Sequence, residues 1–86
     1  MKIKWVPLAL DDLKDIHEYI AIENKSAAQR TIAVIWEAAN CLTSQPHMGR
    51  QGRVPGTREL VVAGTPFIIP YRVVSGEVQV LRVFHT

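Results

Sequence analysis

The sequence predicts an α+β fold in which a helical hairpin packs on one face of a mainly antiparallel sheet, with the element order β-α-α-β-β-β. Two observations carry this prediction. Between residues 7 and 44, apolar residues recur at helical spacing with one short interruption at Asn24-Lys25. Between residues 57 and 85, three strand-like runs are separated by turn residues. Since the chain has 86 residues, we expect a single domain that spans residues 1–86.

The N-terminal segment predicts a short strand followed at once by a helix. The strand covers Lys2–Val6 and ends before Pro7, which suits the first turn of a helix because its missing N–H would have no helical partner there. The helix is predicted over residues 7–23. Its apolar stripe consists of Ala9, Leu13, Ile16 and Ile20. Asp12 and Glu18 fall off this stripe, so we expect both to face solvent.

A second helix is predicted from Ser26 to about Ser44. Ser26 and Gln29 have the spacing of a capping box, in which each side chain bonds the backbone N–H of the other residue. The apolar stripe of this helix consists of Ala28, Ile32, Ile35, Ala39 and Leu42. Because the link between the two helices is so short, they must fold back on each other as an antiparallel hairpin.

The remaining chain predicts a loop and three strands. Residues 45–56 are rich in glycine and proline, and they carry His47, Arg50 and Arg53 without any acidic residue. The predicted strands are Thr57–Val62, Phe67–Val74 and Glu77–His85, and Ser75-Gly76 forms a tight turn between the last two. Pro70 lies inside the middle strand, where it cannot donate a ladder hydrogen bond. It therefore predicts an edge position, a bulge, or an N–H direction that faces away from a neighbouring strand, and in a central strand it should mark a local irregularity.

Composition excludes several classes of protein. Cys41 is the only cysteine, which excludes an intramolecular disulfide and a CxxC metal or redox motif. His17, His47 and His85 lie on different predicted elements without ligand spacing, so we expect no metal and no cofactor. No apolar run approaches ~18 residues and the N-terminus lacks the pattern of an export signal. We therefore expect no membrane partner and a cytoplasmic location.

Charge is distributed unevenly along the chain, whose net charge is +2. Residues 1–37 carry five Lys/Arg and six Asp/Glu, whereas residues 38–86 carry five Arg and two Glu. A basic second half could face nucleic acid or an acidic protein segment. The hydrophobic fraction of 48% fits either a rich core or a surface that a partner completes, and composition leaves both readings open.

The arginines of the second half are the main candidates for a functional surface: Arg50, Arg53, Arg58, Arg72 and Arg82. Alternation places Arg82 on one strand face with Val78, Val80 and Phe84. It places Arg72 on the face opposite Phe67, Ile69, Tyr71 and Val73. If the helices cover one sheet face, the other could present guanidinium groups as a shallow basic groove for RNA phosphates or an acidic protein segment. The alternative is that these arginines are solvated and only keep the sheet soluble.

Three stretches of the chain carry a family resemblance through their joint order and spacing. The first is ALDDLKDIHEYI over residues 9–20. The second is QPHMGR over residues 45–50, leading to PGTRELVV over residues 55–62. The third is PFIIPYRV over residues 66–73, followed by VLRVFH over residues 80–85. Together they cover nearly the whole chain, and they resemble the ParE/RelE superfamily of type II toxins.

The resemblance implies a growth-arresting toxin that a cognate antitoxin from the same operon holds inactive. In this superfamily the flexible C-terminal segment of the antitoxin typically wraps the toxin and docks on its helices and sheet, which is coupled folding and binding. A toxin–antitoxin hetero-oligomer is therefore expected. The antitoxin-contacting residues that we predict are Leu13, Ile16, Ile20, Ile35 and Phe67.

The superfamily divides by target, and the resemblance favours ParE-like members, which inhibit DNA gyrase. RelE-like members cleave mRNA in the ribosome without a metal, using clustered Lys, Arg and often Tyr. This chain has no lysine in the loop before residue 57, and residues 64–69 are apolar where RelE-like members usually place a catalytic Arg. A general acid or base is thus hard to name. The predicted target-binding residues are Arg50, Arg53, Arg58, Arg72, Arg82 and His85, with Arg58 and Arg82 ranked first.

Two alternatives remain open. One is a RelE-like ribosome-dependent endoribonuclease, with ribosome and mRNA as partners and with Arg58, Arg82 and His85 near the scissile phosphate. The other is an inactive relative that only binds its antitoxin. The chain stops at Thr86, where the superfamily normally continues with basic and aromatic residues. A truncated or naturally short form that binds antitoxin without being toxic is therefore a further expectation.

Overall fold

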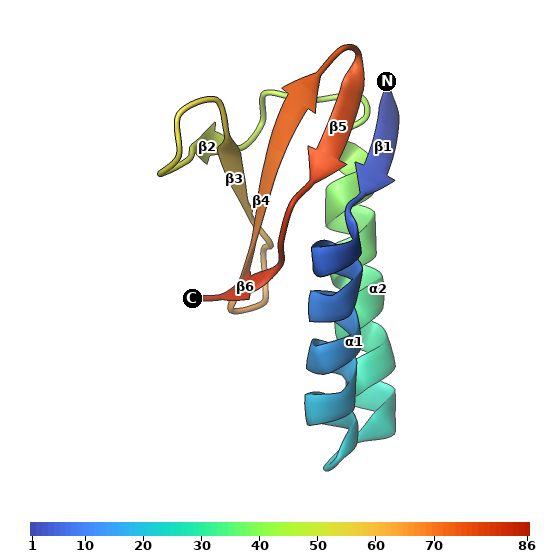
Figure 1. The fold of residues 1–86 in the computed structure, drawn as a ribbon. Coiled ribbons are helices and arrows are strands. Elements are labelled where there is room, and N and C mark those ends of the chain that lie inside the picture. Colours follow the sequence, from blue (N-terminus) through green and yellow to red (C-terminus); the bar gives the residue numbers. More distant parts are fainter.

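The computed structural model describes residues 1–86, and it confirms the predicted α+β fold class (Figure 1). The elements are β1 (Lys2–Trp5), α1 (Pro7–Ala21), α2 (Lys25–Cys41), β2 (Arg50–Gln51), β3 (Arg58–Val61), β4 (Phe67–Val74), β5 (Glu77–Val80) and β6 (Phe84–His85). The sheet has the strand order β1-β5-β4-β3-β2, and β6 pairs with β4. Only the pair β1–β5 is parallel. Figure 1 shows α1 and α2 side by side along one face of the sheet.

The helical hairpin forms as predicted, but the cap of its second helix differs from the prediction. Asn24, not Ser26, is the N-cap of α2: its Oδ1 accepts a hydrogen bond from the backbone N–H of Ala27 at 2.9 Å. Asn24 has the extended backbone that an N-cap requires, and asparagine caps a helix as well as serine does. The predicted capping box of Ser26 and Gln29 is therefore wrong, because both residues already lie inside the helix.

The core lies between the helical hairpin and the sheet. Its largest fully buried side chains are Tyr71, Ile35, Leu42 and Ile69. The sheet contributes alternate residues, since Tyr71 and Ile69 face the helices while Arg72 and Pro70 point to the opposite side. That opposite side carries no helix and is called the open face below. Neither helix has the length and apolar character needed to cross a membrane.

The predicted strand Glu77–His85 is wrong, because a β-bulge divides it into β5 and β6. Tyr71 of β4 pairs with Val80, but Ile68 pairs with Phe84, so three residues of one chain segment oppose two residues of β4. The bulge lies beside Pro70, whose carbonyl accepts a hydrogen bond from Leu81 N–H at 2.9 Å. Proline has no N–H to return, so the ladder cannot continue there. The irregularity predicted at Pro70 is thereby confirmed.

The bulge also overturns the predicted face of the last strand. An unbroken strand would have placed Arg82 and Phe84 in one row with the buried residues Val78 and Val80. Instead Val83 enters the core, while Phe84 pairs with Ile68 on the open face. The two-residue strand β2 is a further addition, since the sequence predicted only a loop there.

Candidate functional site

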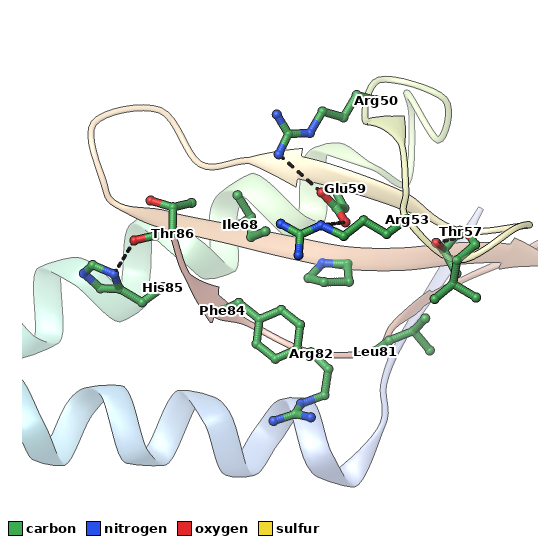
Figure 2. A pocket seen from close by; sticks show the side chains of 12 residues that line it. Arg50, Arg53, Thr57, Glu59, Ile68, Leu81, Arg82, Phe84, His85 and Thr86 are labelled. Carbon is green, nitrogen blue, oxygen red and sulfur yellow. Dashed lines mark hydrogen bonds and ion pairs between the residues drawn. The ribbon is translucent and has the colours of Figure 1, made fainter.

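A shallow groove of about 700 Å³ on the open face collects most of the predicted target-binding residues (Figure 2). Its apolar part is formed by Ile68, Pro70, Leu81 and Phe84. Its polar part includes Arg50, Arg53, Glu59, Arg82 and His85. We call this the basic groove. Four of the six residues predicted for target binding therefore lie together, and Arg58 and Arg72 lie outside.

Glu59 lies between two of the groove arginines and was missed by the sequence analysis. Strand pairing places it directly opposite Arg50, whose Nη2 donates a hydrogen bond to Glu59 Oε1 at 3.3 Å. Arg53 approaches from the loop, with its Nε 4.0 Å from Oε2 (Figure 2). The Glu59 side chain is only 9% exposed, whereas those of Arg50 and Arg53 are 59% and 87% exposed. The carboxylate is thus nearly buried beneath two largely solvated guanidinium groups.

Arg82 borders the basic groove and also fastens the sheet to α1. Its Nε and Nη2 donate to the two carboxylate oxygens of Asp12 at 2.8 and 3.1 Å, and Val83 N–H donates to the same carboxylate at 2.9 Å. The Arg82 guanidinium carbon also lies 4.8 Å from the centre of the Phe84 ring. Sequence reasoning placed Asp12 in solvent, and that prediction is wrong because the bulge brings residues 82 and 83 against α1.

The surroundings of Asp12 favour its charged form. Burial acts to raise the pKa of Asp12, but the hydrogen bonds from Arg82 and Val83 and the positive charge of Arg82 outweigh it, so the pKa lies below the usual 3.8. The hydrogen bond to Asp12 in turn raises the pKa of Arg82. Both groups are therefore ionised at neutral pH, and neither is poised to transfer a proton.

Arg58 and Arg72 have other surroundings. Arg58 pairs with Tyr71 on the helix side of the sheet, and its Nη1 donates to the carbonyl oxygen of Gly49 at 2.9 Å. The Tyr71 hydroxyl accepts from Gly49 N–H at 2.9 Å and donates to the Pro46 carbonyl at 2.7 Å. Both side chains therefore hold the loop before β2. Arg72 lies on the open face but outside the groove, where its Nε donates to Gln79 Oε1 at 2.7 Å.

A second groove, of about 550 Å³, lies beside α1 and is called the apolar groove. Its lining includes Ile16, Tyr19, Ile20, Pro66, Phe67 and His85. Three of the predicted antitoxin-contacting residues, Ile16, Ile20 and Phe67, thus meet here. The other two, Leu13 and Ile35, are buried in the core. Tyr19 is 80% exposed and was missed by the sequence analysis, although its position on the flank of the apolar stripe could have indicated it.

His85 borders both grooves. Its ring meets the Phe67 ring edge-on with the centres 5.4 Å apart, and its Nδ1 lies 2.8 Å from the carbonyl oxygen of Thr86. No group of three or more His, Cys, Asp or Glu side chains in the structure could hold a metal ion. The two grooves are adjacent surfaces: arginines, Glu59 and apolar side chains line one, Asp15, hydroxyl and apolar side chains line the other, and His85 borders both.

Comparison with known proteins assigns this fold to the toxins of the ParE/RelE superfamily. Residues 3–86 match the family model described as the ParE toxin of the type II toxin–antitoxin system parDE. The chain belongs to this family. It is the toxin component of a type II toxin–antitoxin system, and an antitoxin is accordingly its partner.

Individual relatives and solved structures resemble the chain over its full length. It is 44% identical to "Putative toxin Y4kP" of Sinorhizobium fredii over 98% of this chain and 86% of that protein. It is 37% identical to "Toxin RelE2" of Caulobacter vibrioides over 98% of this chain and 93% of that protein. The structure of a chromosomal ParDE system from P. aeruginosa is 31% identical, covers 100% of this chain and 96% of its own, and has a TM-score of 0.90. The RelBE2 complex from Mycobacterium tuberculosis shares the fold at 24% identity, with coverages of 99% and 96% and a TM-score of 0.75.

Proposed function

We propose that this toxin arrests growth by binding DNA gyrase through the basic groove, and that it acts by protein contact rather than by catalysis. The observation that carries the proposal is that each arginine of the groove contacts a carboxylate. Arg50 and Arg53 lie against Glu59, and Arg82 is bound to Asp12. The groove hydroxyls of Thr57 and Thr86 donate to the backbone carbonyls of Val54 and Pro66, so neither is paired with a base as a nucleophile would be. Exposed arginines around an apolar floor instead suit a protein interface, where arginine often dominates the binding energy.

A supercoiling assay with purified gyrase tests the proposal. We expect the toxin to inhibit supercoiling and the Arg53→Ala variant to need about tenfold more protein, because Arg53 is the most exposed groove arginine. Arg72→Ala is the matched control: it removes an arginine from the same sheet face but outside the groove. If the toxin leaves supercoiling intact, gyrase is not the target. If Arg72→Ala weakens inhibition as much as Arg53→Ala does, the basic groove is not the binding surface.

A ribosome-dependent endoribonuclease is the second candidate, and one observation favours it. Arg82 and His85 border the same groove, so a charge stabiliser and a titratable ring could face one phosphate. Mapping mRNA ends after induction of the toxin separates the two candidates. Codon-phased cuts with normal supercoiling would support the nuclease. Intact mRNA with inhibited supercoiling would exclude it, and the absence of any growth effect would support an inactive relative.

We also propose that the antitoxin contacts this toxin at the apolar groove through Ile16, Ile20 and Phe67. The strongest support is that these three side chains and Tyr19, which is 80% exposed, line one groove, since contiguous apolar surface marks interaction sites. In a binding assay with the antitoxin encoded beside this gene, Tyr19→Ala should weaken binding about tenfold or more. Lys14→Ala, on an exposed position of the same helix, should leave binding unchanged. Equal effects of the two variants would contradict this placement.

A further inference from the structure

We propose that Glu59 is a specificity-determining residue that keeps the basic groove from binding nucleic acid. Its carboxylate occupies the position between Arg50 and Arg53 that a phosphate group would otherwise take. The inference concerns the same groove as the proposed function and explains why a groove with several arginines would select a protein partner. It is measured by anion binding, so it can hold or fail separately from gyrase inhibition.

The position of Glu59 makes it an internal substitute for an anionic ligand. Arg50 and Glu59 are directly opposed on β2 and β3, so the pairing register fixes the carboxylate beneath the guanidinium group. On its other side Glu59 is opposed by Pro70, whose ring offers no hydrogen-bond donor. The side chains that contact the carboxylate are therefore arginines: Arg50 through a charged hydrogen bond and Arg53 through a charge contact at 4.0 Å. The same two groups are suited to bind a phosphate.

The charges around the groove lead to the same conclusion. Three arginines border it, but Asp12 neutralises Arg82 and Glu59 offsets one of the other two charges. One net positive charge remains, apart from His85. Binding to a nucleic acid depends on replacing the counterions of several phosphates, so a groove with one effective positive charge binds RNA weakly. Without Glu59, two arginines about one apolar floor would be free to contact phosphates.

The test is binding of a short fluorescein-labelled oligouridylate, measured by anisotropy at about 50 and about 200 mM salt. We expect Glu59→Gln to raise the affinity about tenfold, because the one positive charge that Glu59 offset becomes available for a charged hydrogen bond to phosphate. The salt dependence should steepen by about 0.7, since Glu59→Gln frees one net positive charge and each phosphate contact on a single strand contributes about 0.7. Glutamine has nearly the shape of glutamate and keeps an acceptor for Arg50, which limits the effect on folding.

Glu77→Gln is the matched control. Glu77 is the only other acidic residue after residue 37, it lies on the neighbouring strand β5, and it is outside the groove. Both variants raise the net charge by one, so a purely global charge effect would make them equal. Equal affinities and equal salt slopes for the two variants would overturn the proposal.

Arg53→Ala provides a second test that does not depend on the folding of Glu59→Gln. If Glu59 already engages the arginine, loss of Arg53 should change the weak oligouridylate binding of the native protein by less than about twofold, but it should remove most of the gain in the Glu59→Gln background. A several-fold loss in the native background would show that Arg53 is free to bind phosphate, and the proposal would fail. If the toxin does not inhibit gyrase but the oligouridylate results are as expected, gyrase is not the target and the proposed role of Glu59 still holds.

Discussion

Replacing Asp12 by alanine tests whether the contact between α1 and the bulge stabilises the fold. The carboxylate accepts two hydrogen bonds from Arg82 and one from Val83 N–H, and its side chain is only 14% exposed. Loss of the acceptor leaves the Val83 N–H without its partner, which costs about 2 kcal/mol. Arg82 is 39% exposed and can turn to solvent, so the lost ion pair contributes little to the loss of stability. For a domain of this size, about 2 kcal/mol lowers Tm by about 8–16 °C.

Thermal unfolding followed by circular dichroism at pH 7 measures this effect. Asp11→Ala is the control, because Asp11 is a neighbouring, exposed acid on the same helix and takes part in no ion pair. It should change stability by less than about 0.5 kcal/mol. If Asp12→Ala and Asp11→Ala melt together, the three hydrogen bonds of Asp12 contribute nothing and the reasoning is refuted.

The same contact predicts a pH dependence of stability. The pKa of Asp12 is lower in the folded protein than its usual 3.8, so the folded state binds fewer protons at this site than the unfolded chain does. The stabilisation is therefore complete above the unfolded pKa, from about pH 5 upward, and is lost as the pH falls through the lower folded pKa. Between about pH 5 and pH 2 the native protein should lose more stability than Asp12→Asn does. Parallel curves would contradict the lowered pKa.

Three further predictions concern the fold. Asn24→Ala should lower the free energy of unfolding in urea by about 1 kcal/mol, whereas Ser26→Ala should change it little. The reverse order would show that Ser26 is the N-cap. Tyr71→Phe should lower the free energy of unfolding by about 2 kcal/mol, because it removes the hydroxyl that bonds Gly49 and Pro46. Tyr19→Phe removes an exposed hydroxyl and should have no effect. Equal unfolding midpoints for the two variants would contradict this prediction. Ile35→Ala should lower the free energy of unfolding by about 2–5 kcal/mol. A smaller loss would show that neighbouring core side chains move in to fill the cavity.

Local patterns predicted the parts of the fold that depend on neighbours in sequence. The apolar stripes of the helices and the alternation in Phe67–Val74 rest on spacing alone, and both were confirmed. The cap at Asn24 was missed because two good capping residues lie two positions apart and spacing alone could not rank them.

The site was harder to predict because its contacts join distant residues. Asp12 lies 70 residues from Arg82, so no pattern along the sequence connects them. Glu59 meets Arg50 only because β2 pairs with β3. Arg50 lies in the segment whose glycines and prolines predicted a loop, so this pairing was not expected. The arginines could be named as a set from the sequence. Which arginines line the groove, which hold the loop and which lie elsewhere on the open face depends on the register of strand pairing. The bulge and the short strand β2 determine that register here.

The bulge beside Pro70 links the shape of the basic groove to the position of α1. In an unbroken strand, Val83 would face the open side and Phe84 the helices. The extra residue reverses both, so that Phe84 joins the groove and Val83 the core. The bulge also leaves the Val83 N–H without a strand partner, and Asp12 of α1 supplies the acceptor. The same helix presents Ile16 and Ile20 to the apolar groove. A partner that displaces α1 would therefore move Asp12, the acceptor that holds Arg82 and Val83 beside the basic groove.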